Sequence, residues 1–309
     1  MTAVKTLDKL LSRGEQVRAA SPSGDDLAFN HSLLCSLGLP RRPTLAREFL
    51  RQAGDGWLYV QAGAIDIGDG RPIFQPIPHG VVPRLALIWI STLAKRSNSP
   101  EIFIGRNASE FLRMLGYDTQ GHWFSTLRDQ LHALAVCRLQ MGFHGRTVNE
   151  TAIKRIDAWL PANHKRRSTW PGTLMLDPGF FDELVHHSVP LDVRALHALR
   201  GSALALDIYV WLAHRLHRLN HRPLWLPWHT LKGQFGHEYQ GKHGHGDFCY
   251  SFKRALTKVL IVYPAARLYV KRGGIELHQS APPVPPKTWQ VCQEPHAVAH
   301  RASKDGEAA

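Results

Sequence analysis

The sequence from residue 247 to residue 278 is DFCYSFKRALTKVLIVYPAARLYVKRGGIELH, and it predicts an amphipathic helix followed by a β-hairpin. Up to residue 262, apolar residues recur at three- and four-residue steps, which places on one helical face Phe248, Phe252, Ala255, Leu256 and Val259. The opposite side carries the polar and basic residues Ser251, Lys253, Arg254 and Lys258. Pro264 ends the helix because proline has no backbone N–H to donate.

The hairpin has two predicted strands, residues 266–270 and 275–278, and the glycine pair between them permits a tight turn that also carries Lys271 and Arg272. Ahead of the amphipathic helix, residues 203–219 predict a helix whose first half is apolar almost all round, which is typical of a core helix. Pro227 is placed in the first turn of a short helix that ends at Phe235. Helix, short helix, turn, amphipathic helix and hairpin are the elements of a winged helix.

The same order of elements is predicted once more, nearer the N-terminus. An apolar helix starts at Pro83, a strand covers residues 101–104, and a short helix begins at Asn107 and stops at Gly116. The next helix has an apolar face made of Phe124, Leu127, Leu131 and Leu134. Other residues fall elsewhere on it, namely His122, Ser125, Arg128, Asp129 and His132. Strands 138–143 and 152–160 are expected to pair around residues 144–149.

We therefore expect an α+β protein with tandem winged-helix (helix-turn-helix) domains and disordered termini. Its 309 residues can hold about two ordinary domains. Residues 1–42 lack a sustained apolar period and are expected to be flexible, as is the Pro-rich tail 281–309. Residues 43–188 would form the first domain and residues 189–280 the second.

The charge of the chain favours a polyanionic partner. Lys and Arg number 38 against 25 Asp and Glu, the net charge is +13, and the cations are spread over most of the length. An anionic membrane surface and simple solubility are the alternative explanations. The four cysteines lie far apart with no leader peptide ahead of them, so we expect reduced thiols and a cytoplasmic protein. The longest apolar stretches are shorter than the ~20 residues that cross a bilayer.

In a helix-turn-helix the second helix enters the major groove, so its exposed face must reach base edges and phosphates. Arg128 and Arg254 are suited to bidentate contact with guanine, and the basic turn to the flanking backbone. The residues expected to contact DNA are His122, Ser125, Thr126, Arg128, Arg146, Lys165, Arg166, Arg167, Lys232, Lys242, Ser251, Lys253, Arg254, Lys258, Lys271 and Arg272. The basic residues of either helix alone are also explained by an ordinary solvent-exposed helix face. Two copies, each with such a helix and a polar hairpin, favour DNA binding instead. Residues 164–167, HKRR, could follow the phosphates as a linker or lie in a solvated loop.

Three enzymatic signals are weaker. Residues 236–243 match the glycines and lysine of a phosphate-binding loop, but His243 replaces the Ser or Thr that holds magnesium, and a helix precedes the segment where a strand is required. The potential zinc ligands His237, His243, His245 and Cys249 have none of the usual finger spacings. The His-rich pieces at 186–188 and 243–245 do not form the His-bulky-His strand of a DNA-nicking enzyme. We expect no enzyme activity, no metal and no cofactor.

The chain closely resembles the plasmid-encoded RepA family of replication initiators. The pieces that carry the resemblance run in order through residues 70–290, and the longest are VPLDVRAL at 189–196, SALALDIY at 202–209 and WL at 211–212. Shorter ones are PRL at 83–85 with Trp89, SEF at 109–111, LG at 115–116, LRDQ at 127–130, Trp228, Leu231, QFG at 234–236, Tyr239, FK at 252–253 and VYP at 262–264. Gln120-Gly121, where a Gly-Gly pair is expected, and the extra histidines at 243–245 depart from the family pattern.

The resemblance implies a protein that binds iterons, the repeated sequences of a plasmid origin in double-stranded DNA. It further implies that the protein helps to open the duplex, recruits the host initiator and helicase, and controls copy number by repressing its own gene. Family members are associated with a homodimer in equilibrium with a monomer, and the first winged helix contributes to the dimer interface. The first domain, residues 43–188, is therefore expected to dimerise and to contact the DNA backbone, and the second, residues 189–280, to bind DNA specifically. The alternatives are a transcriptional repressor without an origin function and a metal- or nucleotide-dependent enzyme that acts on DNA.

Overall fold

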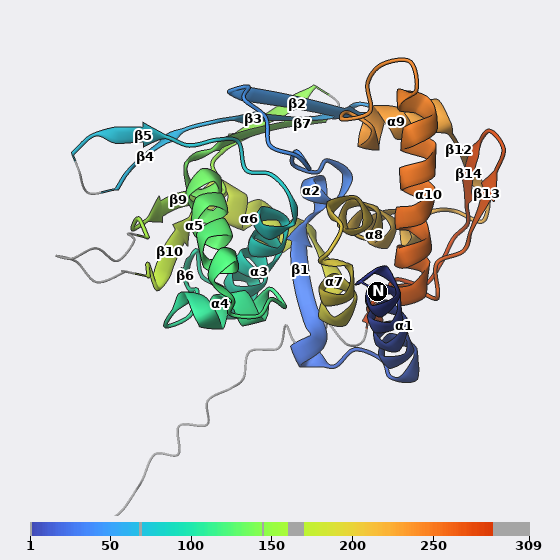
Figure 1. Ribbon diagram of the computed structural model, residues 1–309, viewed down its shortest axis with the longest axis horizontal. Helices are drawn as coiled ribbons and strands as arrows, with labels where there is room; N and C mark the ends of the chain where they lie inside the picture. Colours follow the sequence, from blue (N-terminus) through green and yellow to red (C-terminus); the bar gives the residue numbers. More distant parts are fainter. Residues whose placement is uncertain (1, 68–69, 144, 160–169, 287–309) are drawn as a thin grey trace, which may run out of the picture.

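The computed structural model describes residues 2–67, 70–143, 145–159 and 170–286, which form a mixed α and β structure (Figure 1). Apart from a pair of strands inserted at residues 138–150, the same order of elements occurs twice in it. The first set is α3 (Val81–Ser97), β6 (Glu101–Phe103), α4 (Ala108–Met114), α5 (Gly121–Val136), β9 (Ile153–Ile156) and β10 (Thr173–Leu176). The second set is α8 (Ala203–Arg215), β12 (Leu224–Pro227), α9 (Trp228–Phe235), α10 (Gly244–Val262), β13 (Leu268–Lys271) and β14 (Gly274–Leu277).

The two sets also share one sheet topology. Each has a three-stranded antiparallel sheet in which the last strand lies between the other two, in the orders β6-β10-β9 and β12-β14-β13. Figure 1 shows the first set on the left of the molecule and the second on the right. We name them the first repeat (81–176) and the second repeat (203–277).

Aromatic packing holds α10 against the rest of the second repeat. Phe248 and Phe252 are fully buried on its inner face, as the apolar period predicts. Phe252 packs 5.9 Å from the ring of Trp228 and 5.6 Å from that of Phe235, so α9 and α10 share one core. Burying aromatic rings of this size stabilises a fold by about 1.5–3 kcal/mol each, which fixes the direction in which the outer face of α10 points.

The expectation that residues 1–42 are flexible is wrong for the residues that the structure describes. The segment contains α1 (Thr2–Ala19), the 3₁₀ turn η1 (Gly24–Asp26), β1 (Leu27–His31) and α2 (Ser32–Ser36). All five residues of β1 are buried, because β1 pairs antiparallel with β11 (Ser188–Asp192) and α3 packs against it. Helix α1 packs against α7 (Val193–Leu199) and α10, and Gly14 permits its close approach to Ile261. Sequence patterns do not reveal β1 because its partner lies about 160 residues away.

The C-terminal tail is also packed where it is described. The side chain of Val284 is fully buried, and the Tyr263 hydroxyl donates to the carbonyl of Ala281 at 2.8 Å. Residues 287–309 lie outside the described part of the chain. The predicted flexible tail is therefore wrong for residues 281–286.

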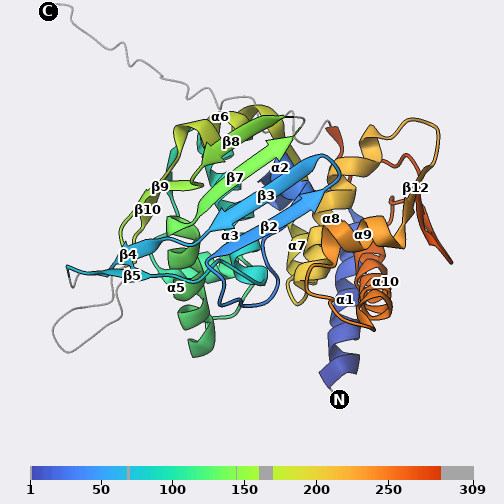
Figure 2. The same cartoon turned by 90° about the horizontal axis from the view of Figure 1, so that it is seen from above.

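A separate sheet corrects the expected strand pairing of the first repeat. β7 (Arg138–Phe143) pairs with β8 (Arg146–Glu150) and with β3 (Gly56–Gln61), which continues to β2 (Glu48–Ala53). Gly145 has φ +80°, which allows the chain to turn directly into β8. Residues 153–156 pair with β10 instead of β7. This sheet lies above both repeats in Figure 1 and is seen face-on in Figure 2.

Three further elements lie before, between and within the repeats, in that order. They are the hairpin of β4 (Ala64–Asp66) and β5 (Pro72–Phe74), the helix α6 (Pro178–His187) and the 3₁₀ turn η2 (Leu216–Arg218). No described helix combines the length and apolar character that crossing a bilayer requires.

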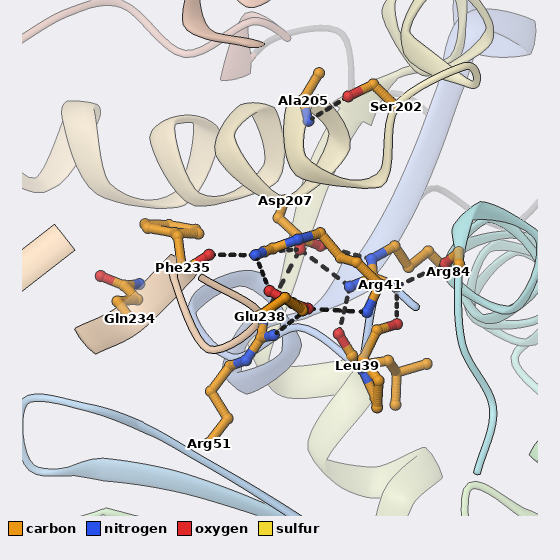
Figure 3. A network of polar contacts seen from close by, with 12 residues as sticks. Leu39, Arg41, Arg51, Arg84, Ser202, Ala205, Asp207, Gln234, Phe235 and Glu238 are labelled. Atoms are coloured by element: carbon orange, nitrogen blue, oxygen red, sulfur yellow. Dashed lines mark hydrogen bonds and ion pairs between the residues drawn. The ribbon is translucent and has the colours of Figure 1, made fainter. Parts of the chain in front are cut away.

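A buried charge network joins the repeats (Figure 3). Asp207 of α8 accepts from Arg84 of α3 at 2.7 Å and 3.0 Å, and Arg41 lies 3.4 Å from the same carboxylate. Glu238 pairs with Arg41 and lies 3.5 Å from Arg51 of β2. Burial alone would raise the pKa of Asp207, but the three guanidinium groups hold that pKa below its ordinary value.

Acid is expected to destabilise the fold through buried histidines. His31 is 1 % exposed, and its Nδ1 accepts from the N–H of Leu33 at 3.3 Å. Burial lowers the pKa of His31 to about 4 from 6.5, mainly because the charged form is desolvated, and the pKa of His214 is lowered to about 4 in the same way. Below pH 6.5 the unfolded chain binds protons that the folded chain does not. Stability therefore falls as the pH drops from 6.5 towards 4.

Urea unfolding at about pH 7.5 and about pH 5.5 measures this loss. Asp207 and Glu238 do not contribute to it, because carboxylates with a lowered pKa lose their stabilisation only at a more acidic pH. In the variant His31→Asn the side-chain oxygen can still cap α2 but does not titrate, so the difference between the two pH values should shrink. If His31→Asn lost as much stability between the two pH values as the wild-type protein does, His31 would not be the group that resists protonation.

Candidate nucleic-acid interface

The outer face of α10 is an exposed polar stripe. It is formed by exposed residues on neighbouring turns of the helix, namely Asp247, Tyr250, the adjacent Lys253 and Arg254, and Thr257. We call them the α10 stripe. The helix is long because its first turn begins at Gly244 and no glycine or proline interrupts residues 247–262. The stripe carries two permanent cations and one carboxylate, with Tyr250 64 % exposed.

The α10 stripe adjoins the basic turn of the second sheet. The ammonium group of Lys253 lies 5.3 Å from the ring centroid of Trp228, and the indole N–H of Trp228 donates to the carbonyl of Arg272 at 3.1 Å. Lys271 and Arg272 are both exposed, and Lys271 pairs with Glu276 across the hairpin. Trp228 therefore holds the base of the turn beside the basic helix, and the two predicted cationic elements form one surface.

Arg254 lies on the other side of the stripe. Its guanidinium carbon is 5.5 Å from the ring centroid of Tyr250, one helical turn earlier. A guanidinium over an aromatic face is restrained but keeps its N–H groups free to donate. Tyr250 and Thr257 are not among the DNA-contacting residues expected from the sequence. They lie four residues before and three residues after Arg254, and this helical spacing places them on the same face.

Some residues predicted from the second repeat lie beside the stripe. Ser251 and Lys258 are half-buried and, with Arg254, line a groove towards Ser202 and Tyr239. Lys232 of α9 is half-buried against the start of α10, and Lys242 is exposed in the turn before it. The stretch 236–243 that resembles a phosphate loop connects α9 to α10 in this structure.

The first repeat places its predicted residues differently. His122 and Ser125 are exposed near the start of α5, whereas Thr126 and Arg128 are half-buried. The hydroxyls of Ser125 and Thr126 both donate to the carbonyl of His122, at 3.0 Å and 2.9 Å. Arg128 lies 3.5 Å from the carboxylate of Asp129. The first repeat therefore presents fewer free cations on its second helix than α10 does.

Two expectations for the first repeat need correction. His132 is predicted off the apolar face, but it is buried, and its Nε2 accepts from the N–H of Trp159 at 3.0 Å. Residues 164–167 are predicted between the two copies. In the chain they come between β9 and β10, and both of these strands belong to the sheet of the first repeat. The basic turn likewise comes between the last two strands of the second repeat.

Lys165, Arg166 and Arg167 themselves lie outside the described residues, and Arg146 is described only as part of the backbone of β8. Within the described residues, no group of three or more His, Cys, Asp or Glu side chains could hold a metal ion. The Sγ atom of Cys249 lies 3.7 Å from Nε2 of His245, one turn earlier on α10.

Comparison with known proteins gives a family and a fold. The solved structure of domains 2 and 3 of RctB, crystallised as selenomethionine derivatives, is 13% identical, covers 81% of this chain and 98% of its own, and has a TM-score of 0.51. A second structure of RctB domains 2–3 is 14% identical, covers 79% of this chain and 94% of its own, and has a TM-score of 0.47. Among curated proteins none matches. Residues 77–226, which run from just before the first repeat into β12, match the family described as plasmid encoded RepA protein, and this match confirms the resemblance to that family.

Proposed function

We propose that this protein is a plasmid replication initiator that binds repeated origin sequences as a sequence-specific duplex DNA-binding protein. The observation that carries the proposal is the α10 stripe beside the basic turn of Lys271 and Arg272, in a chain that matches the RepA family over residues 77–226. A cationic helix face next to a cationic hairpin matches the chemistry of a major groove flanked by phosphates.

In this proposal both repeats are winged helices. Each has the order helix, strand, helix, helix, strand, strand, with the two last strands as the wing, and in the first repeat β7 and β8 are inserted before those two strands. α10 would enter the major groove, Arg254 and Tyr250 would reach base edges, and Lys253 with Lys271 and Arg272 would hold phosphates. The first repeat, whose second helix has fewer free cations, would add backbone contacts through His122 and Ser125 or take part in a dimer.

The proposal extends to the steps after DNA binding. The protein would help to open the origin, recruit the host initiator and helicase, repress its own gene and exist as a homodimer in equilibrium with a monomer. It would be located in the cytoplasm, and it would act without enzymatic activity. The match to the family supports these steps, and the buried network of Figure 3 supports a firm connection between the two repeats during them.

The experiment that tests the initiator role uses a mini-plasmid that carries the origin, introduced into cells with and without this gene. The intact gene should maintain the plasmid, and a deletion of residues 244–277 should abolish maintenance because α10 and the basic turn are lost. Maintenance without the gene, combined with repression of its own promoter by the protein, would instead make it a transcriptional repressor.

A further inference from the structure

A cavity of 520 Å³ lies between the N-terminal elements and the second repeat. One side is formed by α2 and by the turn between β2 and β3, and the other by the end of α8, η2, β12 and α9. Its apolar wall includes Leu33, Leu37, Leu226 and Leu231. A volume of this size accommodates a small organic molecule.

The polar wall of the cavity is cationic. Arg215 and Arg218 line it together with His214, and no carboxylate is among the described residues that line it. Arg218 donates to Nε2 of His214 at 2.6 Å, so that nitrogen carries no proton. Burial, followed by the nearby Arg218, lowers the pKa of His214 to about 4, which keeps the imidazole neutral. The charge that faces the cavity therefore belongs to the two guanidinium groups.

Arg215 lacks a counter-ion within the described part of the chain. Its Nε atom is buried without a hydrogen-bond partner, and the guanidinium carbon lies 5.9 Å from the ring centroid of Trp211. Burial lowers the pKa of Arg215. The protein supplies carboxylates to other buried guanidinium groups, as Asp207 and Glu238 show in Figure 3. A buried donor without a partner is costly, and an oxyanion in the cavity would remove that cost.

We infer that this cavity is a binding site for a small organic phosphate, with the phosphate on Arg215 and Arg218 and an apolar body against the leucine wall. Guanidinium groups pair with phosphate oxygens through parallel N–H donors, which a neutral ligand cannot match. Ser32, Ser36 and Thr230 also line the cavity and offer hydroxyl donors beside the two cations. The inference concerns ligand binding alone and does not depend on the DNA-binding proposal.

The test is isothermal titration calorimetry on the full chain with phenyl phosphate, which combines a phosphate with an apolar ring. Benzyl alcohol serves as the uncharged match and inorganic phosphate as the headgroup alone. Phenyl phosphate should bind at least about 10-fold more tightly than either probe, because only it contacts both walls. Equal binding of phenyl phosphate and benzyl alcohol, or no binding of phenyl phosphate, would overturn the inference.

Two variants locate the site. Arg218→Gln changes an exposed side chain and should weaken phenyl phosphate at least about 10-fold, whereas Arg222→Gln, an exposed arginine outside the cavity lining, should leave its affinity unchanged. Arg215→Gln should weaken the ligand equally and raise the melting temperature of the ligand-free protein, because it removes a half-buried charge whose buried Nε has no hydrogen-bond partner. Weakening of DNA binding by Arg218→Gln without any effect on phenyl phosphate would assign these arginines to DNA and also overturn the inference.

Discussion

Replacing Asp207 by Asn is expected to lower the free energy of unfolding by about 3–5 kcal/mol. Asp207 is the carboxylate that Arg84 contacts at 2.7 Å and that Arg41 and Arg51 approach at 3.4 Å and 3.8 Å. An amide keeps the shape of the side chain but has no charge. Three buried guanidinium groups would then share the single carboxylate of Glu238, and an uncompensated charge in a protein interior is strongly destabilising.

Urea unfolding followed by circular dichroism measures the effect. Asp118→Asn is the matched control, because Asp118 is exposed in the turn between α4 and α5, and it should change the free energy of unfolding by less than about 0.5 kcal/mol. If Asp207→Asn behaved like the control, the network would not hold the two repeats together.

Replacing Arg254 by Ala is expected to cost about 1–3 kcal/mol of binding energy at the specific origin site, or about 5–150-fold in affinity. The guanidinium is exposed on the α10 stripe and is held over Tyr250, from where it can donate two parallel hydrogen bonds to guanine. Binding to a scrambled duplex should change little. Titration of both duplexes by fluorescence anisotropy at the same salt concentration measures the ratio of the two affinities.

Lys271→Ala provides the contrast within the same surface. Lys271 lies in the basic turn, where a cation meets phosphates, so its loss should weaken both duplexes alike and reduce the salt dependence of binding by about one ion. Equal losses on both duplexes for Arg254→Ala would remove Arg254 from base recognition. A loss of specificity for Lys271→Ala would instead place base contacts in the turn.

Local patterns predicted the second repeat well. The amphipathic period beginning at Asp247 ends at Val262, as α10 does, and the turn between β13 and β14 lies at Arg272 and Gly273, which is the first glycine of the predicted pair. These features depend on neighbours within a few turns of the chain, which the sequence displays directly. The same holds for Asn107, whose side chain caps α4 by accepting from the N–H of Glu110 at 2.9 Å.

Long-range pairings could not be predicted in this way. Arg84 and Asp207 are separated by 123 residues, and nothing near either residue indicates its partner. β1 has only five residues, and its pairing with β11 depends on the complete fold. The sequence pattern predicts a strand at residues 138–143, and the structure has β7 there. Its partners are β3 and β8, and only the three-dimensional structure identifies β3. The cationic cavity was missed because Ser32, Ala53, Arg215 and Thr230 come from separate segments.

Binding of the purified protein to the repeat-containing origin fragment of its own plasmid, compared with a scrambled duplex at physiological salt, tests most directly whether this is a sequence-specific initiator. Electrostatic attraction from a net charge of +13 would act on both duplexes. A preference of about 10³-fold or more for the origin fragment is the predicted result. Equal and salt-sensitive binding to both would contradict the proposed function and leave only a basic protein with affinity for polyanions.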